Sequence, residues 1–149
     1  MKLRWVALMT VLTLGVVAPR HAAGQGTPSG GSRVSSAILG QNYPNPFNPT
    51  TTIPFKVDEP PTCPSGSRMH RVTLRIYNVL AQLVAIPILQ GTSGNAGQPL
   101  ENVMLGCGEY TAYWDGMYLR SGREVASGVY LYRIEVDGKA DVRKMIVMK

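Results

Sequence analysis

The sequence has few of the side chains from which catalytic and metal centres are built. Its 149 residues include only two histidines and two cysteines, whereas a structural zinc site takes four Cys or His ligands. The sequence also offers no catalytic triad, no pair of carboxylates and no phosphate-binding loop. We therefore expect a protein that is not an enzyme, with no catalytic residues, metal, cofactor or small-molecule substrate.

Long apolar runs are lacking as well. The longest one, residues 5–17, follows Lys2 and Arg4 and precedes the small residues at positions 22–24. It falls short of the roughly 20 residues that a membrane-spanning helix needs. A basic start, an apolar middle and a small-residue end are typical of a secretory signal peptide. We expect export through residues 1–24, which alone would meet a membrane, to the periplasm, the cell surface or the medium.

A strong excess of one charge is missing too. Three of the fifteen basic residues lie within residues 1–24, which leaves twelve basic against nine acidic residues, a net charge of +3. These residues are scattered, without the basic stripe that is typical of nucleic-acid binding. We expect no nucleic-acid partner.

The cysteines are interpreted in the light of export. Cys63 and Cys107 are the only pair, and an even number of cysteines in an oxidising compartment indicates a disulfide. The alternative is two buried thiols. A bridge between residues 63 and 107 would close a long loop, which would stabilise the fold by about 4 kcal/mol in the chain-entropy treatment.

Residues 25–37 are small, polar and rich in Gly and Ser, which is typical of a flexible leader. From residue 38 onward the sequence shows short runs of alternating character and no helical period. The run RVTLRIYN is predicted to place two sets of side chains on opposite faces, one buried and one exposed: Val72, Leu74 and Ile76 against Arg71, Thr73 and Arg75.

Comparable runs predict further strands at residues 51–57, 82–89, 108–114, 129–136 and 142–149, with shorter ones near 38, 100–105 and 123–126. In the run 82–89, Val84, Ile86 and Ile88 are expected to share a face, and Pro87 favours an edge position. Met145 and Val147 alternate with other apolar residues, so we expect the last strand to be mostly covered. The pattern predicts an antiparallel, immunoglobulin-like β-sandwich of about seven to eight strands over residues 38–149.

The segment QNYPNPFNPTTTIPF is dense in proline. Each proline fixes its own backbone and favours an extended residue before it, which predicts a stiff arm with few hydrogen bonds. Tyr43 and Phe47 are expected to pack onto the core from this arm. An ordinary proline-rich loop is the alternative.

Five motifs in order now point to a family: QNYPNPFNPTTTIPF, VTLRIYNVLAQLV, YTAYWDG, VASGVYLYRIEVDG and KMIVMK. Their arrangement over residues 38–149 resembles the C-terminal sorting domain of type IX secretion cargo and the related immunoglobulin-like domain of the flagellar hook-capping protein. The resemblance implies recognition by an outer-membrane translocon, often followed by cleavage and attachment to surface lipopolysaccharide. Such domains commonly follow a large cargo, whereas here only the leader 25–37 separates the expected signal peptide from the domain. They also commonly have glycine where this chain has Ala81. Both departures weaken the transfer of the mechanism.

Two motifs are expected to be structural. Trp114 should be buried ahead of a turn in which Asp115 bonds its own backbone and Gly116 follows. Gly128, Val129 and Tyr130 match the family's SGVY motif, and Tyr130 is placed for a tyrosine corner. His70, just before a strand, is expected to face solvent rather than act as a base.

The candidate recognition residues lie in the arm and in the closing strand: Pro44, Asn45, Pro46, Lys144 and Lys149. A terminal strand with cationic side chains could be recognised by edge pairing, although solvated lysines on an ordinary last strand explain it equally well. Two functions therefore stand. One is a sorting module recognised by a secretion translocon, and the other is a structural or adhesive module that binds another envelope protein.

Overall fold

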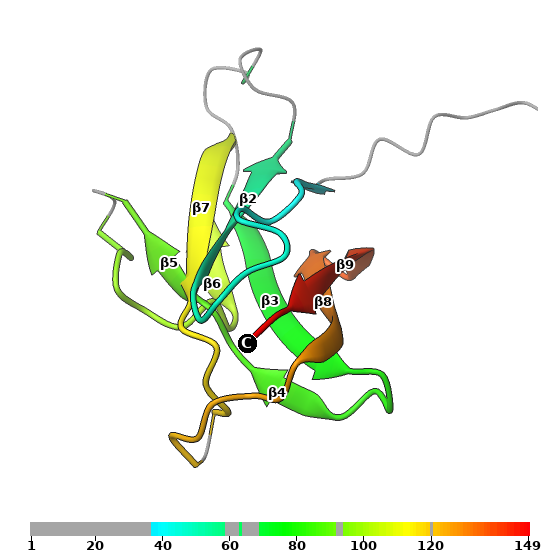
Figure 1. The fold of residues 1–149 in the computed structure, drawn as a ribbon. Helices are drawn as coiled ribbons and strands as arrows, with labels where there is room; N and C mark the ends of the chain where they lie inside the picture. The colour runs from blue at the N-terminus through cyan, green and yellow to red at the C-terminus, as the bar shows by residue number, and fades with distance from the viewer. Residues whose placement is uncertain (1–36, 59–62, 64–68, 92–93, 120) are drawn as a thin grey trace, which may run out of the picture. The chain divides into compact units, whose positions relative to one another are not determined.

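The computed structural model describes residues 37–58, 63, 69–91, 94–119 and 121–149, and the expected signal peptide and most of the leader lie outside this range. The described residues form two antiparallel sheets (Figure 1). The first sheet has the order β1 (Ala37–Leu39), β2 (Thr51–Val57), β7 (Gly108–Trp114) and β5 (Ile88–Gln90). The second has the order β4 (Leu83–Ala85), β3 (His70–Asn78), β8 (Gly128–Val136) and β9 (Lys139–Val147), and β6 (Val103–Leu105) also pairs with β3.

This strand order is that of an immunoglobulin-like sandwich. Labelled in chain order, the first sheet corresponds to strands A, B, E and D, and the second to C′, C, F and G. The described residues contain nine strands rather than seven to eight, because four three-residue strands are present. The expected fold class is confirmed.

Strand alternation builds the core between the sheets. Val72, Leu74 and Ile76 of β3 are fully buried, as predicted, and they face the inward side chains of the opposite sheet. Arg71 is exposed and Arg75 is partly exposed, so the predicted register of β3 is confirmed. Thr73 is an exception, since it is buried rather than exposed. Its hydroxyl accepts a 3.0 Å hydrogen bond from the backbone amide of Asn102, whose segment covers this part of the strand.

The prediction of a single strand over residues 82–89 is wrong. The run divides into β4, in the second sheet, and β5, in the first, and the chain crosses between the sheets at Pro87. Proline has no amide to donate to a ladder, and its carbonyl here accepts a 2.8 Å hydrogen bond from the amide of Leu100. Val84 is buried and Ile88 is exposed, so they do not share a face.

Two other expectations also fail. Met145 and Val147 of β9 are buried, but Ile146 and Met148 are exposed, so one face of this strand is open. Residues 123–126 form no strand, since only an isolated bridge joins Glu124 to Met117.

Candidate functional site

The proline-rich arm, residues 42–49, connects the two sheets. On one side Tyr43 pairs with Thr52 of β2 through two backbone hydrogen bonds of 2.8 Å. On the other side Phe47 lies beside β9 in a parallel bridge to Val147. Figure 1 shows the cyan arm next to the red end of the chain. Cis peptide bonds precede Pro44, Pro46 and Pro49.

A buried polar cluster supports the base of the arm, so the expectation of few hydrogen bonds is wrong. Asn42 is buried, and its side-chain amide donates to the carbonyl of Pro44 at 3.0 Å and to the hydroxyl of Thr51 at 2.9 Å. Its backbone amide donates to the hydroxyl of Tyr132 at 3.1 Å. That hydroxyl donates in turn to the carbonyl of Gly40 at 2.8 Å. Burial raises the pKa of Tyr132, which keeps the hydroxyl in the form that donates.

The tip of the arm covers the edge of β9. The side-chain oxygen of Asn45 accepts a 3.0 Å hydrogen bond from the amide of Ile146. The amide of Phe47 donates to the carbonyl of Ile146, and the amide of Met148 donates to the carbonyl of Phe47, both at 3.0 Å. The structure therefore brings the candidate residues Pro44, Asn45 and Pro46 together with the end of the closing strand.

The two aromatic residues of the arm behave differently. Phe47 is buried as expected, with its ring centroid 5.5 Å from that of Trp114. Tyr43 is 79% exposed, so the expectation that it packs on the core is wrong. Its bonds to Thr52 run through the backbone, and the alternation along this segment turns its side chain outward.

The two candidate lysines lie apart from each other. Lys144 is exposed on the outer face of the second sheet, opposite Leu131 of β8. The ammonium group of Lys149 lies 2.9 Å from a carboxylate oxygen of Glu124, and its backbone amide donates to the hydroxyl of Ser127 at 3.1 Å. Lys149 is thus an ion-paired residue at the chain end rather than a free cation.

The Trp114 and Tyr130 motifs have the expected structural roles. The ring of Trp114 lies 5.9 Å from that of Tyr130, and both side chains are buried. The hydroxyl of Tyr130 donates a 2.9 Å hydrogen bond to the carbonyl of Ala126, which is the tyrosine-corner geometry. Burial raises the pKa of Tyr130 to about 12. Gly128 begins β8 at a φ of 154°, whereas Val129 points outward and is not part of the buried motif.

The turn after Trp114 anchors the far end of the arm. Asp115 accepts a 2.9 Å hydrogen bond from the amide of Met117, as predicted, and the indole of Trp114 donates to the carbonyl of Met117 at 3.0 Å. Gly116 has a φ of 76°, and a Cβ there would lie 2.3 Å from the carbonyl oxygen of Pro49. Only glycine allows this close approach.

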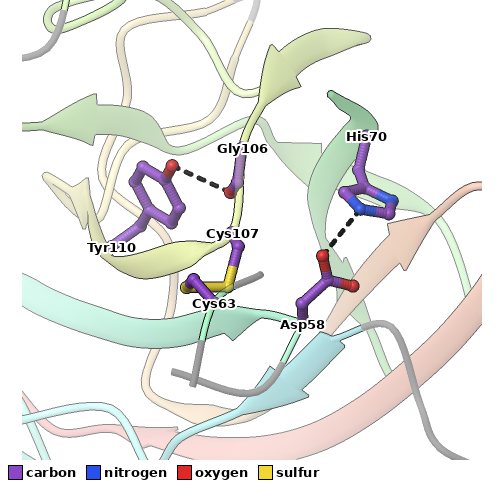
Figure 2. The surroundings of a disulfide bond; sticks show 6 residues. All are labelled: Asp58, Cys63, His70, Gly106, Cys107 and Tyr110. Atoms are coloured by element: carbon purple, nitrogen blue, oxygen red, sulfur yellow. Dashed lines mark hydrogen bonds and ion pairs between the residues drawn. A yellow bond between two sulfur atoms is a disulfide. The ribbon is translucent and has the colours of Figure 1, made fainter. Parts of the chain in front are cut away.

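A disulfide joins Cys63 to Cys107, with the two Cα atoms 5.6 Å apart, so the predicted pairing is confirmed. Figure 2 shows it beside Tyr110, whose hydroxyl donates to the carbonyl of Gly106 at 3.0 Å. Burial raises the pKa of Tyr110. The bridge is compatible with an oxidising compartment.

His70 does not face solvent, contrary to expectation. It is 3% exposed and lies between two carboxylates. One ring nitrogen is 2.8 Å from a carboxylate oxygen of Asp58, and the other is 2.8 Å from Asp137. Figure 2 marks the contact between His70 and Asp58. Asp58 directly follows β2 and Asp137 lies in the β8–β9 hairpin, so His70 connects both sheets. Its neighbours are far away in sequence, and no local pattern marked it. Both ring nitrogens of His70 are therefore engaged by carboxylates.

Within the described part of the chain, no group of three or more His, Cys, Asp or Glu side chains is arranged to hold a metal ion. No helix in that part is long and apolar enough to cross a membrane. Compared with known proteins, the chain matches no protein family, no curated protein and no solved structure.

Proposed function

We propose that the chain is an exported, non-catalytic module that an outer-membrane translocon recognises. The observation that carries the proposal is the hydrogen-bonded contact between the arm and the end of β9. These are two of the segments on which the resemblance to type IX sorting domains rests, and they are distant in sequence. Their contact through Asn45 and Ile146 creates one exposed surface that a secretion machine could recognise.

The geometry favours contact with this surface as a whole over the addition of a strand. An edge strand offers a row of unpaired backbone groups to a partner. Here the arm already bonds the backbone of Ile146 in β9 and of Met148 just after it. A pairing partner would have to displace the arm, so we propose that the translocon contacts Pro44, Asn45 and Pro46 together with the exposed Lys144.

Export is part of the same proposal. It is supported by the signal-like composition of residues 1–24 and by the disulfide, since such bridges persist in oxidising compartments. Whether the mature protein stays in the periplasm, on the surface or in the medium would follow from the machine that handles it.

An adhesive or structural module is the second candidate, and the outer face of the second sheet favours it. Val129 and Ile146 are cross-strand neighbours there, and both are exposed together with Leu131 and Val142. Contiguous exposed apolar side chains mark interaction surfaces. On this hypothesis another envelope protein would cover this face.

Surface delivery of a reporter tests the first proposal. A passive reporter is inserted after Gly30, which leaves residues 38–149 intact, in a host with the type IX machinery. The test variant carries Lys144→Ala with Lys149→Ala. The matched control carries Arg71→Ala with Lys56→Ala, which also removes one exposed cation and one ion-paired cation, since Lys56 pairs with Glu109 at 2.5 Å.

We expect the test variant to lose surface delivery and the control to retain it, with both reporters equally resistant to protease as a check of folding. Equal delivery of the unsubstituted, test and control reporters would refute recognition at this surface. The adhesive hypothesis would then predict that Val129→Ser with Leu131→Ser abolishes binding to an envelope fraction.

A further inference from the structure

The turn between β3 and β4 exposes two large aliphatic side chains at one end of the sandwich. Val79 is 70% exposed and Leu80 is 74% exposed. Apart from Tyr43, no large apolar side chain in the described residues is more exposed. Two adjacent aliphatic side chains left in water forgo the free energy of burial, so an apolar environment that covers them would be favoured.

The turn holds these side chains in one position. The side-chain oxygen of Asn78 accepts hydrogen bonds from the amides of Leu80 at 3.0 Å and Gln82 at 2.9 Å. The side chain of Asn78 also donates to that of Gln82 at 2.8 Å, and its carbonyl accepts from the amide of Ala81 at 3.0 Å. A turn held by so many bonds cannot easily fold its apolar side chains back onto the domain, so they are already presented for contact.

The apolar surface continues past the turn. Leu83 follows in β4, and the amide of Leu119 donates a 2.9 Å hydrogen bond to the carbonyl of Val84. Leu83, Tyr118 and Leu119 are exposed and line a shared hollow of about 430 Å³. Figure 1 shows β4 and the segment that follows β7 at the same end of the sandwich. We call the exposed set the apolar tip: Val79, Leu80, Leu83, Tyr118 and Leu119.

The charges around the apolar tip indicate what kind of surface it fits. Residues 77–85 contain no charged side chain, and residues 117–123 contain two arginines and no carboxylate. Two carboxylates flank this segment: Asp115 accepts a 2.9 Å hydrogen bond from the amide of Met117, and Glu124 is paired with Lys149 at 2.9 Å. The two arginines and Lys149 outnumber these two carboxylates, and an excess of cations favours the negatively charged headgroups of a membrane. A tyrosine beside aliphatic residues is typical of a membrane interface.

We propose that the apolar tip inserts into the interface of a lipid membrane, with Val79 and Leu80 at the boundary of the acyl chains and Arg123 among the headgroups. The turn projects outward instead of forming a groove, so it fits a soft apolar layer that can close around it. The contact is independent of recognition by a translocon. It adds a membrane-binding surface to a chain in which residues 1–24 alone were expected to meet a membrane.

Vesicle co-sedimentation of residues 25–149 tests this proposal without interference from the apolar segment 5–17. All described strands and core residues lie within residues 37–147, so this piece keeps every contact of the fold. Vesicles consist of phosphatidylcholine, alone or mixed with phosphatidylglycerol. The test variant carries Val79→Ser with Leu80→Ser. The control is Ile38→Ser, which removes a side chain that is 48% exposed on the other sheet.

We expect the unsubstituted protein to bind both vesicles, more tightly when phosphatidylglycerol is present. The test variant should bind at least about tenfold more weakly, and the control should be unchanged. The proposal is overturned if the unsubstituted protein binds neither kind of vesicle. It is also overturned if the protein binds only the charged vesicles and the test variant keeps that binding, or if the control loses as much binding as the test variant. A second measurement uses Leu80→Trp, whose fluorescence should be quenched by bromine-labelled acyl chains. An unquenched tryptophan at this position contradicts insertion.

Discussion

Asn45 and Ile146 are 101 residues apart in sequence, yet the side-chain oxygen of Asn45 accepts a 3.0 Å hydrogen bond from the amide of Ile146. This bond joins the proline-rich arm of one sheet to the last strand of the other. It also occupies a backbone group on the outer edge of β9 that would otherwise be open to another strand. The arm therefore protects the edge at which the chain ends.

Replacing Asn45 by Ala should weaken this junction. The lost hydrogen bond is expected to lower the free energy of unfolding by about 0.5–1.5 kcal/mol, measured by chemical denaturation. Hydrogen exchange should accelerate more at the amide of Ile146 than at the amide of Met145, because Met145 pairs with Tyr130 inside the sheet. Asn45→Asp keeps an acceptor oxygen and serves as the control. Unchanged exchange at Ile146 in Asn45→Ala would show that the bond contributes nothing to the edge.

Removal of the disulfide by Cys63→Ser with Cys107→Ser should lower the free energy of unfolding by about 2–4 kcal/mol. The bridge ties the connection between β2 and β3 to the start of β7, and its loss enlarges the set of unfolded conformations. Denaturation midpoints of the variant and of the unsubstituted protein under a reducing agent should agree. If the reduced protein is as stable as the oxidised one, the bridge has no stabilising role.

Ala81 adopts a φ of 58°, a left-handed backbone conformation that residues with a Cβ atom avoid. The resemblance to a family with glycine at this position agrees with that backbone. Ala81→Gly should therefore raise the free energy of unfolding by about 0.5–1 kcal/mol, measured by thermal unfolding.

The reverse change at a comparable site is the control for this prediction. Gly122 has a φ of 60°, and a Cβ added there would meet no atom within 4 Å. Gly122→Ala should thus cost about 1 kcal/mol through the backbone conformation alone. If Ala81→Gly destabilises the protein instead, the turn does not carry the strain that its φ indicates.

Alternation of apolar residues predicted much of this fold. The pattern of Val72, Leu74 and Ile76 set the register of β3 correctly, because a half-buried strand repeats every second residue. It failed at residues 82–89, where the apolar run continues across Pro87 while the chain changes sheets. A run of apolar residues does not reveal which layer each half joins.

Contacts between segments that are distant in the chain could not be predicted from the sequence. His70 is buried because Asp58 and Asp137 close around it, and both come from other strands or turns. Thr73 is buried by the segment of Asn102. The prolines marked the arm as a distinct segment, but its contact with Ile146 depends on the complete sandwich. The cysteine pairing succeeded only because two cysteines allow one bridge.

Stability should fall in alkaline solution, and Tyr130 should contribute to the loss. An unfolded tyrosine titrates near pH 10, whereas burial raises the pKa of Tyr130 in the folded protein to about 12. Between these values the unfolded chain has released the proton while the folded chain retains it, so rising pH favours unfolding. The contribution of Tyr130 is thus fully present below about pH 10 and is lost as the pH rises toward about 12.

The test is the slope of the free energy of unfolding against pH across this interval, in unsubstituted protein and in Tyr130→Phe. The variant has no phenol at this site, so its slope should be shallower, although it loses the bond to Ala126 and is less stable at neutral pH. Some slope should remain, because burial also raises the pKa values of Tyr110 and Tyr132. An identical slope in Tyr130→Phe would contradict the raised pKa of the tyrosine corner.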